Sequence, residues 1–354
     1  DLTVEDLIEE IDRVVTISHA GYAKSQPLTE DEAQRRGGVG KAATALKDED
    51  FVEHLLVAHS HATVLCFSNL GKVYWLKVYQ IPAASRQSRG RPMVNLLPLG
   101  EDERITAFLP VQNYDADHFV FMATANGTVK KTPLPQFARA RSAGLIALEL
   151  EEGNTLVGAA VTDGHCDVLL FTSDGKAVRF KESDVRSMGR TARGVRGVRL
   201  QGGGRVISLI VPREDHPVLT AASHGLGKRS PLADYPQKGR GTQGVIGMRL
   251  PDRSTELVAA VQVSDADEVM LISDQGTLVR IRANEISQLG RSAQGVKLVN
   301  VREGEKLVGV ARIEESPEQG DTDAAVSVPG GAPAGPDDGS APEAGGVPQS
   351  RPED

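Results

Sequence analysis

The sequence predicts an all-β protein built from six repeated units of about 50 residues, a propeller-like array. Three observations predict it. A short apolar run with a glycine turn recurs six times, an Arg-x-x-x-Gly motif recurs in the same phase, and each unit closes with another apolar segment. Beyond the first dozen residues no stretch has the period of about 3.6 residues that marks an amphipathic helix. We therefore expect each unit to form a four-stranded sheet.

The first element of each unit is a predicted β-hairpin. A mainly apolar run ends at Ser or Thr, a glycine follows at the turn, and the second strand carries a base. The runs are Val14–Ile17, Val64–Phe67, Phe119–Ala123, Val168–Phe171, Val218–Ala222 and Val269–Ile272; the glycines are Gly21, Gly71, Gly127, Gly175, Gly225 and Gly276; and the bases are Lys24, Lys77, Lys130, Arg179, Lys228 and Arg280. Asn126-Gly127 and Asp174-Gly175 are typical of two-residue hairpin turns, whose central positions favour a positive φ.

The second half of each unit carries the Arg-x-x-x-Gly motif and then a further apolar strand. The motif occurs at Arg36–Gly40, Arg86–Gly90, Arg190–Gly194, Arg240–Gly244 and Arg291–Gly295, and in the third unit Arg139 lies one residue further from Gly144. The closing strands are expected at Leu55–Ala58, Ile105–Leu109, Leu156–Val161, Val206–Val211, Leu257–Val261 and Leu307–Ala311.

Charge divides the chain into three parts. Residues 1–12 carry six acids and no base, and residues 314–354 carry ten acids and one base, so the net charge of −8 leaves +7 on residues 13–313. We predict an acidic linker over 1–12, the β-array over 13–313 and an acidic, disordered tail over 314–354. The tail is rich in Pro, Gly and Ala and offers too little apolar area to fold. A basic body with acidic ends favours a polyanionic partner.

Other classes of protein receive little support from the sequence. No apolar run reaches the ~18 residues of a membrane helix, and residues 1–12 lack the features of a signal peptide. Cys66 and Cys166 are interpreted as reduced thiols of a cytoplasmic protein. His59 and His61 lack a surrounding ligand cluster, so we expect no metal site. The motif at Gly239–Gly244 has the letters of a dinucleotide-binding loop but precedes a strand-like Val-Ile pair, so we expect no cofactor, and no catalytic residues stand out.

The most specific feature lies in the first unit, at residues 34–41. Two adjacent arginines and a lysine flank a loop with three glycines, which lets the backbone approach a phosphate while guanidinium groups pair with its oxygens. This segment resembles the gyrase A box, Gln-Arg-Arg-Gly-Gly followed by Lys or Arg and by Gly, and residues 13–313 resemble the C-terminal domain of bacterial DNA gyrase A subunits. The matching positions are Gln34, Arg35, Arg36, Gly37, Gly38 and Gly40; Val39 replaces the usual base, and Lys41 follows.

This resemblance implies a six-bladed β-pinwheel, a propeller variant whose blades exchange strands and whose basic outer rim wraps duplex DNA. It implies sequence-tolerant binding, bending and chiral wrapping by a non-catalytic domain, which is expected to be monomeric when isolated. The wrapped segment would be presented to the cleavage core of the gyrase A subunit, within a heterotetramer with the gyrase B subunit that introduces negative supercoils with ATP. The DNA-binding candidates besides the box are Lys41, Arg86, Arg89, Arg91, Arg139, Arg141, Arg190, Arg193, Arg196, Lys238, Arg240, Arg291 and Lys297.

Several alternatives remain open at this point. The tail could compete with DNA for the rim or could simply keep the protein soluble. The array could be the counterpart in topoisomerase IV, which resembles the same fold without an intact box. It could instead be a scaffold that binds an acidic protein, or an enzyme with a site in its central channel. About a third of the rim bases are expected to be satisfied by carboxylates or loop carbonyls.

Overall fold

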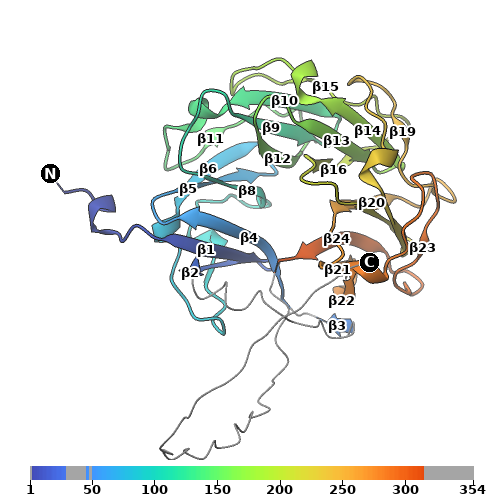
Figure 1. Cartoon of the computed structure of the whole chain (residues 1–354), viewed down its shortest axis with the longest axis horizontal. Helices are drawn as coiled ribbons and strands as arrows, with labels where there is room; N and C mark the ends of the chain where they lie inside the picture. The colour runs from blue at the N-terminus through green and yellow to red at the C-terminus, as the bar shows by residue number, and fades with distance from the viewer. Residues whose placement is uncertain (1, 29–44, 48–49, 315–354) are drawn as a thin grey trace, which may run out of the picture. The chain divides into compact units, whose positions relative to one another are not determined.

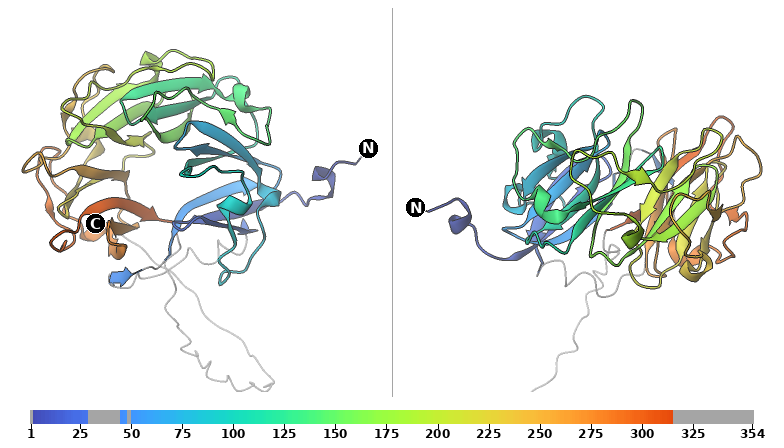
Figure 2. Two further views of the ribbon diagram at one scale, coloured as in Figure 1. Left: turned by 180° about the vertical axis from the view of Figure 1, so that it is seen from behind. Right: turned by 90° about the horizontal axis from the view of Figure 1, so that it is seen from above.

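The computed structural model describes residues 2–28, 45–47 and 50–314. Within these ranges the strands form six antiparallel sheets of four strands each, which we call blades one to six. The blades follow one another around a common centre (Figure 1), and Figure 2 shows them from behind and from above. The prediction of a six-bladed all-β fold is therefore confirmed. The predicted tail and the segment 29–44 lie outside the described residues.

Each blade has the same strand order from the centre outward. Blade one contains β4 (Val52–His59), β1 (Asp12–Ser18), β2 (Tyr22–Pro27) and β7 (Arg91–Pro92); blade two contains β8 (Ile105–Val111), β5 (Thr63–Ser68), β6 (Lys72–Lys77) and β11 (Leu145–Ile146); blade three contains β12 (Leu156–Thr162), β9 (Phe119–Thr124), β10 (Thr128–Pro133) and β15 (Val195–Arg196). Blade four contains β16 (Val206–Ile210), β13 (Asp167–Thr172), β14 (Lys176–Lys181) and β19 (Val245–Ile246); blade five contains β20 (Leu257–Gln262), β17 (Val218–Ala222), β18 (Leu226–Ser230) and β23 (Val296–Lys297); blade six contains β24 (Leu307–Ile313), β21 (Glu268–Ser273), β22 (Thr277–Arg282) and β3 (Ala45–Lys47).

The apolar runs of the sequence form the second strand of every blade. Every residue of β5 and of β17 is buried, because neighbouring blades cover both faces of each sheet. The predicted turn glycines lie at the hairpin tips with positive φ, for example 80° at Gly71 and 86° at Gly175. The predicted closing strands form the innermost strands. The hairpin predictions are confirmed in all six blades.

The outermost strand of each sheet comes from a neighbouring repeat. In blade one, β7 belongs to the second repeat and pairs Ala23 with Arg91; in blade four, β19 belongs to the fifth repeat and pairs Ala177 with Val245. Blade six receives β3 from the first repeat, and the backbone of Leu278 pairs with that of Leu46. The circle of blades is thus closed by a segment from the beginning of the chain, and this exchange is the β-pinwheel arrangement.

Short 3-10 helices connect the strands. Those in the described residues are η1 (Glu5–Leu7), η2 (Val78–Gln80), η3 (Met93–Asn95), η4 (Leu134–Phe137), η5 (Glu182–Asp184), η6 (Leu232–Asp234) and η7 (Ala283–Glu285). Five of them, η2 and η4–η7, directly follow the third strand of a blade. Within the described ranges no helix is long and apolar enough to cross a membrane.

The core is divided into separate apolar clusters between blades. The junction of blades six and one has a small one, in which Phe51 packs with Met270, Leu278, Ala311 and Ile313. Phe51 precedes β4 and is 1% exposed, and its carbonyl accepts a hydrogen bond from the amide of His19 at 2.9 Å. A residue of the first repeat therefore completes the core of the last blade.

Replacing Phe51 with Ala is expected to lower the free energy of unfolding by about 3–5 kcal/mol, because it leaves a cavity at this junction. Urea unfolding followed by circular dichroism measures the change. Leu70→Ala is the control, since Leu70 is 47% exposed at a hairpin tip and its loss should have little effect. Equal effects of the two substitutions would contradict the assignment of Phe51 to the closure of the ring.

Candidate nucleic-acid interface

Most of the described DNA-binding candidates lie on the loops that lead into the outermost strands, whereas Arg91, Arg196 and Lys297 lie on these strands themselves. We call these loops the rim loops: residues 83–90, 138–144, 187–194, 236–244 and 287–295, each of which leads into a strand of the preceding blade. Gln34, Arg35, Arg36, Gly37, Gly38, Gly40 and Lys41 lie outside the described residues, so the gyrase A box remains a prediction. The exposed candidates are Arg86, Arg89, Arg91, Arg139, Arg141, Arg193, Arg196, Lys238, Arg240 and Lys297, whereas Arg190 and Arg291 are half-buried.

The glycine of each described Arg-x-x-x-Gly motif has a structural cause. Gly90, Gly194, Gly244 and Gly295 all have positive φ, between 80° and 99°. A Cβ on Gly194 would lie 2.4 Å from the carbonyl oxygen of Val129, and the other three would meet third-strand carbonyl oxygens at 2.2–2.6 Å. The rim loop can therefore enter the neighbouring sheet only where a side chain is absent. Strand exchange alone requires these glycines, so the recurrence of the motif is not by itself a sign of phosphate contact.

A second repeated contact joins the third strand of one blade to the 3-10 segment of the next. In each contact, a side chain at a fixed register position of the third strand donates a hydrogen bond to a backbone carbonyl of the 3-10 segment. The contacts are Ser25 to Ile81 (3.3 Å), Trp75 to Phe137 (2.7 Å), Lys131 to Glu182 (3.3 Å), Arg179 to Leu232 and Tyr235 (3.0 and 3.3 Å), and Arg229 to Ile286 (2.8 Å). We call these the blade latches. These five side chains belong to four residue types, so no recurring residue in the sequence revealed the contact.

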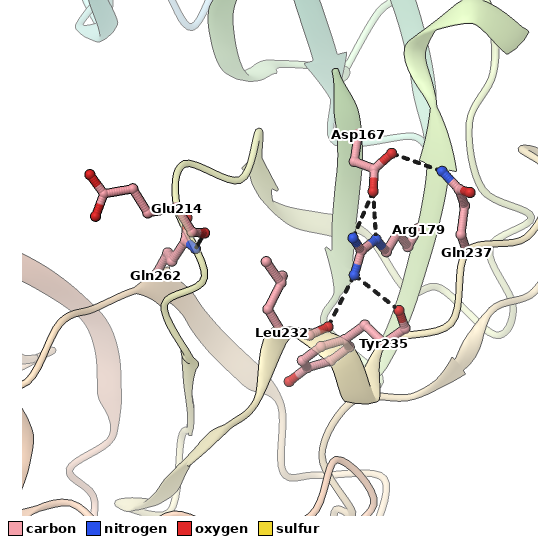
Figure 3. Close-up of polar contacts among 7 residues, drawn as sticks. All are labelled: Asp167, Arg179, Glu214, Leu232, Tyr235, Gln237 and Gln262. Carbon is pink, nitrogen blue, oxygen red and sulfur yellow. Dashed lines mark hydrogen bonds and ion pairs between the residues drawn. The ribbon is translucent and has the colours of Figure 1, made fainter. Parts of the chain in front are cut away.

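The latch between blades four and five shows how a base is neutralised within the fold. The Arg179 guanidinium donates to Asp167 Oδ2 from Nε at 2.9 Å and from Nη2 at 2.6 Å (Figure 3). The other carboxylate oxygen of Asp167 accepts a hydrogen bond from Gln237 at 2.8 Å. Gln237 belongs to the rim loop of blade five, so the ion pair fixes the start of that loop.

Two motif arginines hold their own loops. Arg240 donates to the carbonyls of Asp184 and Arg196 at 3.0 and 3.1 Å, and Arg291 donates to the carbonyl of Asp234 at 3.0 Å and to that of Ile246. In both cases the guanidinium joins the 3-10 segment of the preceding repeat to the outermost strand that the same repeat contributes to the blade before it. These two residues of the predicted DNA-binding set therefore have structural partners.

The remaining DNA-binding candidates differ in whether their side chains contact another residue. Arg193 lies 3.4 Å from the carboxylate of Glu149, and the Arg89 guanidinium stacks over Tyr22, 4.2 Å from the ring centroid. The side chains of Arg86, Arg91, Arg139, Arg141, Arg190, Arg196, Lys238 and Lys297 make no hydrogen bond or ion pair with any described residue. Most of the rim bases thus keep their charge available to an external anion.

Two bases of the hairpin strands are buried instead of exposed. Lys130 and Lys228 are both 0% exposed, on β10 and β18. Burial lowers the pKa of Lys130 to about 7 and that of Lys228 to about 8, and the nearby Arg190 and Arg291 charges act in the same direction. Backbone carbonyls that accept from each ammonium group oppose this effect. The bases of the hairpin strands thus do not form one exposed row.

The histidines of the first repeat are engaged in local contacts. His61 lies 3.6 Å from the Glu10 carboxylate and 3.1 Å from the carbonyl of Ile8, and its amide donates to His59 Nδ1. Both histidines thus have partners at the connection between β4 and β5. Among the described residues, Asp163, Cys166 and Glu182 lie close enough to share an ion. Burial raises the pKa of the Cys166 thiol to about 11.

Other sequence interpretations also meet their structural test. Cys66 is a free, buried thiol, and Cys166 is free as well. The motif at residues 239–244 leads into β19 and not into a helix, so the strand predicted after it is confirmed.

Titratable groups near the centre gather where blade one meets blade six. His19 Nδ1 lies 3.5 Å from the Glu53 carboxylate, and His54 Nε2 lies 3.9 Å from it. The hydrogen bond to Glu53 raises the pKa of His19, whereas burial lowers the pKa of His54. His19 stacks on Phe51 and His54 packs edge-on against Phe108. These groups pair with one another and pack on aromatic rings, an arrangement that fits a structural junction.

Three further bases outside the predicted set, the exposed Arg249 and Arg253 and the half-buried Lys176, line a hollow of blade four. This open hollow of about 720 Å³ lies at the hairpin end of the blade, and the three side chains have no partner among the described residues. Acidic side chains of the same hollow bond elsewhere, as Glu256 does to Arg205 at 3.1 Å. The sequence did not single these bases out, because they fall outside the phase of the Arg-x-x-x-Gly motif.

The family described as DNA gyrase C-terminal domain, beta-propeller, matches the chain in six consecutive segments, residues 12–59, 62–112, 118–163, 167–213, 216–265 and 267–314. The chain belongs to this family. Each segment contains one of the six repeats seen in the sequence. The match to the family therefore extends over all six repeats of the chain.

Relatives of this gyrase C-terminal domain are bacterial gyrase subunits. The DNA gyrase A subunit of Escherichia coli K12 is 54% identical over 343 residues, which cover 97% of this chain and 39% of that protein. The A subunit of Pseudomonas aeruginosa PAO1 gyrase is 52% identical over 364 residues, covering 91% of this chain and 39% of that protein. The chain thus spans about two fifths of the length of these curated relatives.

Solved structures share the fold. A DNA gyrase A C-terminal domain superposes with a TM-score of 0.63 at 25% identity, covering 85% of this chain and 99% of that one. The C-terminal domain of a DNA topoisomerase IV superposes with a TM-score of 0.74 at 24% identity, covering 86% of this chain and 94% of that one. The second likeness bears on the fold alone.

Replacing Gly194 with Ala tests the entry of the rim loop into the neighbouring sheet. Gly153→Ala is the matched control, because Gly153 also has a positive φ, 79°, but has no atom within 4 Å of a new Cβ. The control is expected to cost about 1–2 kcal/mol of stability from backbone strain. Gly194→Ala is expected to cost a further ~1–3 kcal/mol from the clash with Val129. Chemical denaturation measures both, and equal costs would refute the close approach.

Proposed function

We propose that this domain binds duplex DNA without sequence preference, bends it, and wraps it with one handedness around the rim loops. The observation that carries the proposal is the set of bases without a partner among the described residues at successive outer corners of the blades, as at the exposed Arg86 and Arg139 and the half-buried Arg190. A duplex that follows the outer edge would meet such a group at each corner. The gyrase A relatives support DNA as the polyanion.

The mechanism is electrostatic. Bending a site of 20–30 base pairs by 40–90° costs roughly 1–6 kcal/mol, and a longer wrap costs several times more. No single arginine offsets this cost, but a series of phosphate contacts does, because each neutralised phosphate also releases counterions. The rim loops enter two-residue strands and contain no element long enough to enter a groove, so the bases of the DNA are not read directly.

The place of this domain in a larger enzyme follows from the relatives. We propose that it presents the wrapped segment to the cleavage core of the gyrase A subunit, within a cytoplasmic heterotetramer with the gyrase B subunit that introduces negative supercoils with ATP. On this view the domain is itself non-catalytic, binds no cofactor and is monomeric when isolated. The acidic tail, residues 314–354, is proposed to compete with DNA for the basic rim, since it carries ten acids and one base.

The alternatives are weighed by specific observations. Identity of 54% to gyrase subunits, together with the box-like segment 34–40, favours gyrase over topoisomerase IV. A scaffold for an acidic protein would use the same bases, so DNA binding and salt dependence must separate the two. The enzyme alternative receives no support from the described residues of the inner strands, where Glu53 and His54 serve the blade junction.

Wrapping is tested by ligating nicked plasmid in the presence of the whole chain and measuring the change in linking number. We expect a shift of one sign that grows with protein concentration. The double variant Arg35→Ala, Arg36→Ala is expected to lose most of the shift while still binding DNA through the remaining rim loops. Binding without a shift would leave a basic propeller that does not wrap DNA, and no binding at low salt would favour the scaffold.

Arg190→Ala and Arg240→Ala are a matched pair for testing the rim, because both are motif arginines and only Arg240 has carbonyl partners. Arg190→Ala is expected to weaken DNA binding and to reduce the salt slope of log K by about 1, at unchanged stability. Arg240→Ala is expected to cost about 1 kcal/mol of stability. Binding titrations at several salt concentrations and urea unfolding provide the two measurements; a reversed pattern would contradict the assignment.

A further inference from the structure

We propose that Lys24 and Lys130 are positioning residues, which hold the backbone of two rim loops so that the motif arginines Arg86 and Arg190 are left free for DNA phosphates. The inference rests on the proposed function and adds a division of labour between two kinds of rim loop. In one kind a lysine of the preceding blade anchors the loop. In the other the motif arginine anchors it.

Lys24 lies on β2 of blade one and anchors the rim loop 83–90, which leads from the second repeat into blade one. Its Nζ donates to the carbonyls of Ser85, Arg86 and Ser88 at 3.2, 2.8 and 2.9 Å. An ammonium group has three N–H donors. These three carbonyl acceptors of Lys24 all lie within residues 85–88. The loop is therefore fixed next to Arg86 and just before Arg89, which stacks over Tyr22.

Lys130 repeats this arrangement two blades further on. Its Nζ donates to the carbonyls of Arg190 and Ala192 at 2.6 and 3.2 Å, and to that of Ala147 at 2.7 Å. Arg190 and Ala192 belong to the rim loop 187–194, which leads from the fourth repeat into blade three. Ala147 follows β11, the outermost strand of blade two. One buried ammonium thus joins blade three to segments of both neighbouring blades.

The register of the strands shows that the two lysines are equivalent. Lys24 pairs with Thr16 and Lys130 with Met122, the same step along the hairpin. In blade four this position is Val178, which pairs with Leu170 and has no donor. The rim loop that enters blade four carries Arg240, and there the guanidinium itself donates to the carbonyls of Asp184 and Arg196.

In four of the five rim loops the state of the motif arginine follows the anchor. The exception is the loop 138–144, because the equivalent position of blade two is Tyr74, whose hydroxyl donates to Glu103. Arg139 of that loop makes no hydrogen bond or ion pair with a described residue although no lysine holds the loop.

Where the lysine bonds the loop directly, the Arg86 and Arg190 side chains make no hydrogen bond or ion pair with a described residue. In blade five the equivalent Lys228 bonds Gly247 and Ser230 but no carbonyl of the next rim loop, and there Arg291 anchors its own loop. A backbone already held by a lysine needs no guanidinium, so the arginine can pair with a phosphate at lower ordering cost.

Double-mutant cycles on the whole chain test this inference, with the binding constant for a linear duplex at fixed salt as the readout. We expect Lys130→Met to weaken binding, and Arg190→Ala to add little in the Lys130→Met background. Arg89 lies on the rim loop that Lys24 anchors. Arg89→Ala should therefore weaken DNA binding by the same factor in the wild type and in the Lys130→Met background. A coupling of about twofold or more, confined to the loop that the lysine anchors, is the expected result.

A reciprocal cycle keeps the test decisive if the buried Lys130 site does not tolerate Met. Lys24 is half-buried, so Lys24→Met is expected to fold, and it should couple with Arg86→Ala but not with Arg190→Ala. Lys181→Met, which removes an exposed lysine outside the rim loops, is the charge control and should couple with neither.

The outcomes separate this inference from the proposed function. Effects that multiply independently in both cycles, or lysine variants that bind DNA as the wild type does, would overturn the positioning role while DNA binding stands. Coupling of each lysine with arginines of both loops would show general destabilisation and would also overturn it. Failure of the wild type to bind DNA would remove the proposed function itself.

Discussion

The constraint on which this fold depends is the close approach of a glycine backbone to the third strand of a neighbouring blade. At Gly194 and Gly244 the space for a Cβ is taken by the carbonyl oxygens of Val129 and Ala177. Only there can the chain cross from one repeat to the sheet of another and cover its edge. An uncovered outer edge would expose unpaired amide and carbonyl groups to other chains. Strand exchange covers each edge and makes each blade incomplete without its neighbour.

The contacts that reinforce this exchange keep their geometry while their chemistry varies. A hydroxyl, an indole, an ammonium and two guanidinium groups make the blade latches, each to a backbone carbonyl of the next 3-10 segment. A carbonyl accepts from any of these donors, so the residue type is free to change so long as a donor of sufficient reach remains. Basic residues serve this internal role in three of the blades, which means that a basic residue in this fold is not by itself a sign of DNA binding.

Local patterns made the hairpins predictable. Apolar runs, turn glycines and a period of about 50 residues located the two central strands and the innermost strand of every blade. The outermost strands have only two or three residues, too few to show an alternating pattern, and their exchange was implied by family resemblance alone. For the interface, the sequence located the rim loops but could not separate Arg190 from Arg240, because the difference lies in which carbonyls each guanidinium reaches. It also could not show that Lys130 is buried, since that depends on Ala147, later in its own repeat, and on the rim loop 187–194 of the next repeat.

The pairing of β3 with β22 has a consequence for how the protein is made. Residues 45–47 are synthesised before most of the array, yet their partner strand is residues 277–282, in the last repeat. During translation from the N-terminus, five blades can pair their central strands in turn, while the segment that completes the sixth must wait until nearly the whole array has left the ribosome. The entropy cost of closing so long a loop rises only slowly with its length, so the delay is set by synthesis more than by the search for the partner. The circle of blades is therefore completed late in the folding of each new chain, in a single step.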